Sequence, residues 1–239
     1  MPPTLLLIHG QLFDRRSWEL VLPLLKVPAV AVDLPDHGGN PSHASTLQAM
    51  GGEVLAARRG IEGPVVAVGH SLGALVVLEA LIADPAAFSA VLLLGLPEEP
   101  TPENRAAMAS MADMVEVHGL PDPLLSALVL GMMSAEHQAQ VGDALGYLKR
   151  YLDVQPERAV RVGRAIAARL AVAPRLPEVI PPTRVLTGLV DVNTPIDRAR
   201  PLAEALGAPI EATEGGHLLL LEHPALVAAA IEERLERVV

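Results

Sequence analysis

Short apolar segments alternate along the chain with longer segments whose apolar positions recur at helical spacing. Runs rich in Val, Leu, Ile and Ala predict strands at residues 4–8, 29–33, 64–69, 90–95, 183–188 and 208–213. The segments between these runs predict helices at residues 16–25, 44–59, 71–83, 195–206 and 224–238. Strands that are apolar throughout and separated by helices are typical of a parallel sheet covered on both faces. We therefore expect an α/β fold with a mostly parallel sheet of six strands.

The alternation stops between residues 95 and 183, where the pattern is helical and predicts no strand. This stretch contains five of the seven methionines and both tyrosines of the chain. We expect residues 98–178 to form a helical cap over one edge of the sheet, and residues 1–97 and 179–239 to form the core. The methionines either pack the cap onto the core or line an adaptable apolar pocket, and the two roles are compatible.

Two adjacent polar residues interrupt the apolar run "VVAVGHSLGALVVLEAL", which extends from residue 65 to 81. They are His70 and Ser71, and the glycines Gly69 and Gly73 flank them. The pattern G-x-S-x-G between a strand and a helix is typical of a sharp turn that exposes a serine, since only small residues let the two backbones approach. The start of the following helix directs free N–H groups toward an oxyanion beside this serine. Ser71 is therefore the candidate nucleophile.

A serine hydroxyl needs a histidine to accept its proton and a carboxylate to orient that histidine. Asp191 follows the fifth predicted strand and His217 follows the sixth, so parallel topology places both at the same sheet edge as Ser71. The alternative acids are Glu98 and Glu99, which follow the fourth strand. The alternative base, His223, more often has a surface or capping role at the start of a helix.

Five motifs occur in one order along the chain: "LLLIHG", "DLPDHG", "GHSLG", "TGLVD" and "GGHLLLLEHP". With them the sequence resembles the α/β-hydrolase family, in its serine-nucleophile, esterase- or thioesterase-like branch, over nearly its whole length. The resemblance implies a three-layer fold with a cap, in which the two strands that open many family members are missing. It also implies an oxyanion hole formed by the backbone N–H groups of Gln11 and Leu72, and it implies no cofactor or metal ion.

Some positions bear on the substrate pocket. Residues expected to line it are Phe13, Met108, Met111, Met132 and Tyr147. The similar menaquinone-pathway lyases usually carry an arginine four residues after the serine, where this chain has Leu75. This difference argues against that lyase and against an anionic substrate held at the turn. In "VDLPDHGGNP", Asp36 replaces the usual glycine of a scaffold turn, where we expect it to adopt a positive φ.

The composition of the chain excludes some classes of binding partner. The formal charge of −10 argues against binding nucleic acid or an anionic membrane, and no apolar run reaches the length of a bilayer span. The chain has no cysteine, which excludes thiolate chemistry, and its first residues do not resemble a signal peptide, so we expect a cytoplasmic protein. Its oligomeric state stays open.

These observations favour hydrolysis of a carboxylester or thioester of a small or medium apolar acyl group through an acyl-enzyme. The alternatives are carbon–carbon or enol-lactone hydrolysis, lyase or acyl-transfer chemistry with the same triad, and a ligand-binding protein with no turnover.

Overall fold

The sheet has six parallel strands. The computed structural model describes residues 2–43 and 46–236. Across the sheet the strands run in the order β2-β1-β3-β4-β5-β6, and each neighbouring pair is parallel. Their bounds are β1 (Thr4–Ile8), β2 (Ala29–Val32), β3 (Val65–His70), β4 (Ala90–Leu94), β5 (Thr183–Gly188) and β6 (Ile210–Thr213). The predicted number of strands and their parallel arrangement are confirmed.

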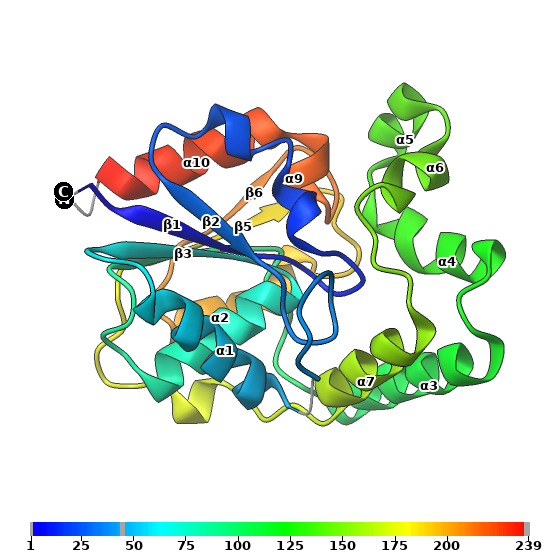
Figure 1. The fold of residues 1–239 in the computed structure, drawn as a ribbon, viewed down its shortest axis with the longest axis horizontal. Helices are drawn as coiled ribbons and strands as arrows, with labels where there is room; N and C mark the ends of the chain where they lie inside the picture. The colour runs from blue at the N-terminus through cyan, green and yellow to red at the C-terminus, as the bar shows by residue number, and fades with distance from the viewer. Residues whose placement is uncertain (1, 44–45, 237–239) are drawn as a thin grey trace.

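Helices cover both faces of the sheet. Figure 1 shows α1 and α2 against one face and α9 and α10 against the other. The flanking helices are α1 (Leu47–Arg59), α2 (Leu72–Ala83), α8 (Ile196–Ala205), α9 (Leu219–Glu222) and α10 (Pro224–Glu236). In β1, Leu6 and Ile8 pack in the apolar cluster of α1, α2 and α8, whereas Leu5 and Leu7 pack in the cluster of α9 and α10. Both sides of the strand are thus buried, which explains its apolar sequence and confirms the three-layer fold.

Four of the predicted helices are present, and one prediction is wrong. Helices α1, α2, α8 and α10 match their predicted ranges; residues 44–45 and 237–238 of those ranges lie outside the described residues. Instead of a helix over 16–25, the chain forms two short 3₁₀ turns, η1 (Arg15–Trp18) and η2 (Leu22–Leu24). Pro23 explains this difference, because proline lacks the N–H that a continuing α-helix needs and disfavours helical backbone at the preceding residue.

The chain between β4 and β5 forms a group of helices that we call the helical insertion. It comprises α3 (Pro102–His118), α4 (Asp122–Val129), η3 (Leu130–Met132), α5 (Ala135–Val141), α6 (Ala144–Lys149), α7 (Pro156–Ala167) and η4 (Ala173–Arg175). Figure 1 shows α3 to α7 beyond the carboxyl ends of the strands. Arg161 of α7 binds the buried carboxylate of Asp36 through two nitrogens, and Asp36 adopts the expected positive φ of 60°. The cap boundaries at residues 98 and 178 stay a prediction.

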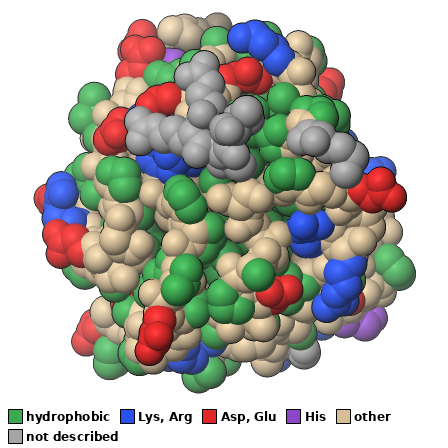
Figure 2. All heavy atoms as spheres, turned by 90° about the vertical axis from the view of Figure 1, so that its left-hand side faces the viewer, with side chains coloured by type: hydrophobic (Ala, Val, Ile, Leu, Met, Phe, Trp, Pro, Cys, Tyr) green, Lys and Arg blue, Asp and Glu red, His purple; other side chains and the backbone are tan. Residues whose placement is uncertain are grey.

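The amino ends of the strands lie at the opposite end of the sheet from the helical insertion. On this face, seen in Figure 2, basic and acidic side chains are dispersed among apolar and uncharged ones. Across the part of the chain that the structure describes, no helix is both long and apolar enough to cross a membrane.

Besides His217, three buried histidines lie at the carboxyl ends of the strands. The rings of His9 and His37 are in edge contact at 4.7 Å, and His9 Nε2 accepts a hydrogen bond from the backbone N–H of Leu34. The third, His70, donates from Nε2 to the carbonyl oxygen of His217 over 2.9 Å. Burial lowers the pKa of all three, and that of His70 falls to about 3. These histidines are neutral in the folded protein at neutral pH.

We expect this burial to make the protein sensitive to acid. An unfolded histidine takes up a proton below about pH 6.5, whereas folded His70 does so only near pH 3. The free energy of unfolding should therefore fall by about 1.4 kcal/mol per pH unit through His70 as the pH decreases from 6.5. Chemical denaturation of the wild type and of His70→Gln between pH 7 and about pH 4 measures this slope.

For His70→Gln, the free energy of unfolding should depend on pH less steeply, by about 1.4 kcal/mol per pH unit. A glutamine amide can donate the same hydrogen bond but cannot titrate. The control is His118→Gln, which makes the same substitution at an exposed histidine of α3. Equal slopes in the wild type and His70→Gln would contradict the assignment of a strongly lowered pKa to His70.

Candidate active site

Ser71 lies in a tight turn between β3 and α2. Its backbone has φ 53° and ψ −113°, a conformation that non-glycine residues rarely adopt. The glycines on either side permit the close approach, since a Cβ on Gly69 would lie 2.5 Å from Gly73 O and one on Gly73 would collide with Ile8 O. The Ser71 N–H donates to Leu94 O over 2.9 Å, which fixes the turn to β4. The fold thus places the Ser71 side chain at the carboxyl edge of the sheet.

Asp191 and His217 are in direct contact at the same edge. Asp191 Oδ2 lies 2.8 Å from His217 Nδ1, and both side chains are buried. Burial alone would raise the pKa of Asp191, but hydrogen bonds from His217 and Thr194 outweigh it and hold this pKa well below its usual range. An ionised carboxylate can only accept hydrogen bonds, so the His217 proton resides on Nδ1. The lone pair of His217 Nε2 is then available to accept a proton.

The loop after β5 holds Asp191 through hydrogen bonds from its own residues. Thr194 donates from its hydroxyl to Asp191 Oδ2 over 2.6 Å, and the N–H groups of Asn193 and Thr194 donate to Oδ1. Neither Asn193 nor Thr194 caps α8, whose N-cap residue is Pro195. The signal for this arrangement is an aspartate followed two and three residues later by polar residues, as in turns that bind their own backbone.

The backbone of His217 is held from two directions. Its carbonyl accepts the hydrogen bond from His70, and its N–H donates to Met132 O of the helical insertion over 2.7 Å. The buried carboxylate of Glu222 accepts hydrogen bonds from the N–H groups of Gly216 and Ser134. The segment that carries His217 is therefore joined to both the core and the insertion. Sequence reasoning missed Glu222 and Met132 in these roles.

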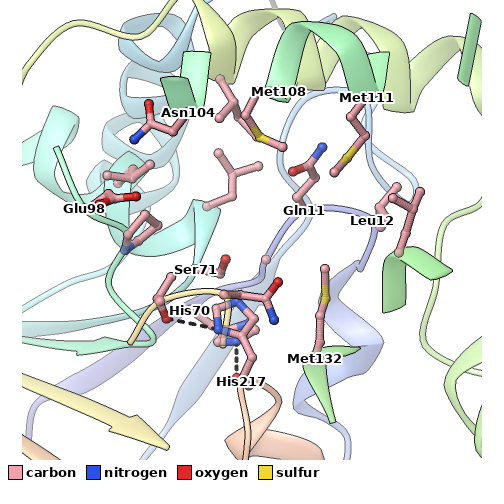
Figure 3. Close-up of a pocket in the computed structure, with 18 of the residues that line it drawn as sticks. Gln11, Leu12, His70, Ser71, Glu98, Asn104, Met108, Met111, Met132 and His217 are labelled. Carbon is pink, nitrogen blue, oxygen red and sulfur yellow. Dashed lines mark hydrogen bonds between the residues drawn. The ribbon is translucent and has the colours of Figure 1, made fainter. Parts of the chain in front are cut away.

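A cavity of about 280 Å³ lies above Ser71 and His217, between the sheet edge and the helical insertion. Figure 3 shows Met108, Met111 and Met132 around it, with Ser71 and His217 at its floor. Phe13 also lines it, so these four expected residues surround one space. The Ser71 and His217 side chains, both within the described chain, are not joined by a hydrogen bond.

Tyr147, also expected at the pocket, is not among the residues that line this cavity. Its hydroxyl donates to Leu221 O over 3.3 Å, and its ring packs against those of His137 and Tyr151. Tyr147 therefore packs the insertion onto the segment around α9 instead of lining the cavity.

The predicted oxyanion-hole donors lie at the cavity floor. Gln11 and Leu72 both line the cavity, and their backbone N–H groups donate to no acceptor among the residues that the structure describes. Unpaired N–H groups beside a nucleophile can bind developing negative charge.

The alternative acids have other partners. Glu99 accepts hydrogen bonds from the N–H groups of Val172 and Ala173, and the nearest ion-pair contact of Glu98 is Arg198 at 3.7 Å. His223 is half-buried and lies 3.7 Å from the exposed carboxylate of Glu214. The geometry brings Asp191, and neither glutamate, to His217.

Polar groups line one side of the cavity. Figure 3 shows Glu98 and Asn104 opposite Met111, Leu12 and Met132. Arg169 and Arg198 also line the cavity, and Arg169 is buried. Within residues 2–43 and 46–236 there is no cluster of three or more His, Cys, Asp or Glu side chains arranged to hold a metal ion.

Comparison with known proteins identifies the family. Over 97% of both chains, the sequence is 26% identical to the pimeloyl-[acyl-carrier protein] methyl ester esterase of Aromatoleum aromaticum. A thermophilic esterase from Thermogutta terrifontis has a similar structure, with a TM-score of 0.88 at 22% identity over 100% of this chain and 91% of the other. The enol-lactonase of Burkholderia xenovorans gives a TM-score of 0.82 at 21% identity over 99% and 92%. The profile of the alpha/beta hydrolase family matches residues 5–230, and the chain therefore belongs to this family.

Proposed function

We propose that the protein is a serine hydrolase that cleaves a carboxylester or thioester of a small or medium acyl group through an acyl-enzyme. The observation that carries the proposal is the 2.8 Å contact between Asp191 and His217, beside a cavity that also contains Ser71 in its strained turn. In this proposal Ser71 is the nucleophile, His217 the general base and Asp191 the residue that orients it.

The proposed reaction has two halves. His217 Nε2 accepts the proton of Ser71 Oγ, which attacks the substrate carbonyl carbon, and the carbonyl electron pair moves onto its oxygen. The N–H groups of Gln11 and Leu72 bind this oxyanion. The intermediate collapses and expels the alcohol or thiol, which takes the proton from His217. A water molecule then attacks the acyl-enzyme with His217 again as base, which releases the acid and restores Ser71. We expect the hydrogen bond from Ser71 to His217 to form in the substrate complex.

The shape and lining of the cavity support a substrate of modest size. A volume of about 280 Å³ is near the lower end of ligand pockets, and flexible methionines adapt to apolar groups. The name of the curated relative describes cleavage of a methyl ester, which supports ester hydrolysis here. Enol-lactone or carbon–carbon hydrolysis, lyase chemistry and acyl transfer would require the same three residues and differ in the bond or acceptor.

We expect Ser71→Ala to lower kcat for a p-nitrophenyl ester by about a millionfold, because the nucleophile is lost. The wild type should also be labelled covalently by a fluorophosphonate, and Ser71→Ala should not. The matched control is Ser110→Ala, which removes an exposed hydroxyl on α3 and should leave labelling and turnover unchanged. A wild type that is neither labelled nor active would instead favour a ligand-binding protein.

For the acid, Asp191→Asn should lower kcat by about 10⁴-fold, because the amide favours the wrong tautomer of His217. Glu98→Gln and Glu99→Gln should retain most of the turnover of the same uncharged ester, since neither carboxylate contacts His217. The measurement compares kcat of the three variants by steady-state kinetics. Circular dichroism checks that each variant is folded. Near-full activity in Asp191→Asn together with a large loss in either glutamate variant would transfer the role to that glutamate.

A further inference from the structure

Arg169 is a buried cation at the polar side of the cavity. It follows α7, is 5% exposed and lines the cavity. Its Nη1 and Nη2 nitrogens donate to the backbone oxygens of Ile166 and Glu98, over 3.3 and 3.1 Å. Nε is also buried and has no hydrogen-bond partner among the described residues. A guanidinium has five N–H groups, and these two bonds leave three of them free.

No carboxylate of the described chain neutralises this guanidinium through an ion pair. The nearby carboxylate of Glu99 is bound by backbone N–H groups, and that of Glu98 lies 3.7 Å from Arg198. Arg105 adds a further positive charge close by, where it donates to Ala167 O. Burial lowers the pKa of Arg169, and the charge of Arg105 lowers it further. The cavity itself is lined by two arginines, Arg169 and Arg198, and by one carboxylate, Glu98, so positive charge is in excess there.

A buried charge without a counter-ion is energetically costly, and a ligand that supplies the opposite charge offsets this cost. The planar guanidinium matches a carboxylate in particular, because parallel N–H groups can bind both of its oxygens. The cavity geometry fits such a ligand, since Ser71 lies between the side with Glu98 and Asn104 and the side with Met111 and Met132 (Figure 3). An ester with its carbonyl at Ser71 would extend one part toward the methionines and the other toward Arg169.

We propose that Arg169 determines specificity by binding an ionised carboxylate at the far end of the ester, so that the substrates are half-esters of dicarboxylic acids. This inference rests on the proposed hydrolase function. It revises the expectation drawn from Leu75: the turn itself carries no arginine, but the segment after α7 brings one into the same cavity.

The test compares pairs of substrates that differ only in the terminal carboxylate. Monobutyl succinate, glutarate and adipate are each paired with the butyl ester of butanoic, pentanoic or hexanoic acid. For at least one chain length, the wild type should have the higher kcat/KM for the half-ester. Arg169→Gln should lower kcat/KM for that half-ester by about 10- to 100-fold, mainly through KM, because a charged hydrogen bond is lost. The same variant should leave the uncharged ester within a few-fold of wild type.

Two further variants distinguish a direct hydrogen bond between Arg169 and the substrate carboxylate from a general effect of positive charge in the cavity. Arg169→Lys keeps the charge but not the planar fork, so it should recover part of the loss. Arg198→Gln removes a charge from the same cavity on a side chain that is 63% exposed, and it should lower the half-ester kcat/KM much less. Equal losses in Arg198→Gln and Arg169→Gln, or an equal loss for the charged and uncharged esters in Arg169→Gln, would overturn the proposal.

A binding measurement keeps the test independent of the folding of the Arg169 variants. Calorimetric titration of Ser71→Ala should give a lower Kd for the preferred half-ester than for its uncharged partner, and equal values would overturn the proposal. Failure of the hydrolase function is distinguishable from failure of this inference. A wild type that cleaves neither ester and resists the fluorophosphonate contradicts the proposed function, whereas equal cleavage of both esters contradicts the role of Arg169 alone.

Discussion

The close approach of α2 to the ends of β1 and β3 is the constraint on which the site depends. It requires glycine at positions 69 and 73, and it holds Ser71 in a backbone conformation that costs on the order of 1–3 kcal/mol. The hydrogen bond from Ser71 N–H to Leu94 O and the packing of α2 over the sheet offset this strain. Because the turn is rigid, the Ser71 side chain and the N–H groups at the start of α2 have fixed positions before any ligand arrives.

The position of His217 depends on hydrogen bonds of the main chain as much as on contacts of its side chain. The peptide groups of His217 bind His70 from the core and Met132 from the helical insertion, and Glu222 joins the same two parts one residue earlier at Gly216. A shift of η3 would therefore move His217 relative to Ser71. The insertion both covers the cavity and takes part in positioning the imidazole, although it contributes none of the three residues assigned to catalysis.

The features that follow from topology were predictable from the sequence. Parallel strands end at one sheet edge, so residues after β3, β5 and β6 meet there, and the apolar pattern located those strands. The prediction of a helix over 16–25 was wrong because it relied on the apolar spacing and gave too little weight to Pro23, which interrupts a helix. Tyr147 was placed in the pocket by composition alone, but side-chain direction within α6 depends on tertiary packing. The contact of Thr194 with Asp191 was not predicted, because it depends on a loop conformation that has no periodic signal in the sequence.

Arg169 illustrates a further limit of sequence reasoning about specificity. It is one of sixteen arginines, and its sequence neighbourhood resembles that of the basic positions of α7. Only the fold shows that this one is buried, bound to two backbone oxygens and close to a cavity that begins at Ser71. The nucleophile must sit in a turn with strict local requirements, so it leaves a motif. A charge that recognises the far end of a substrate needs only to reach the cavity, and any segment of the insertion can supply it.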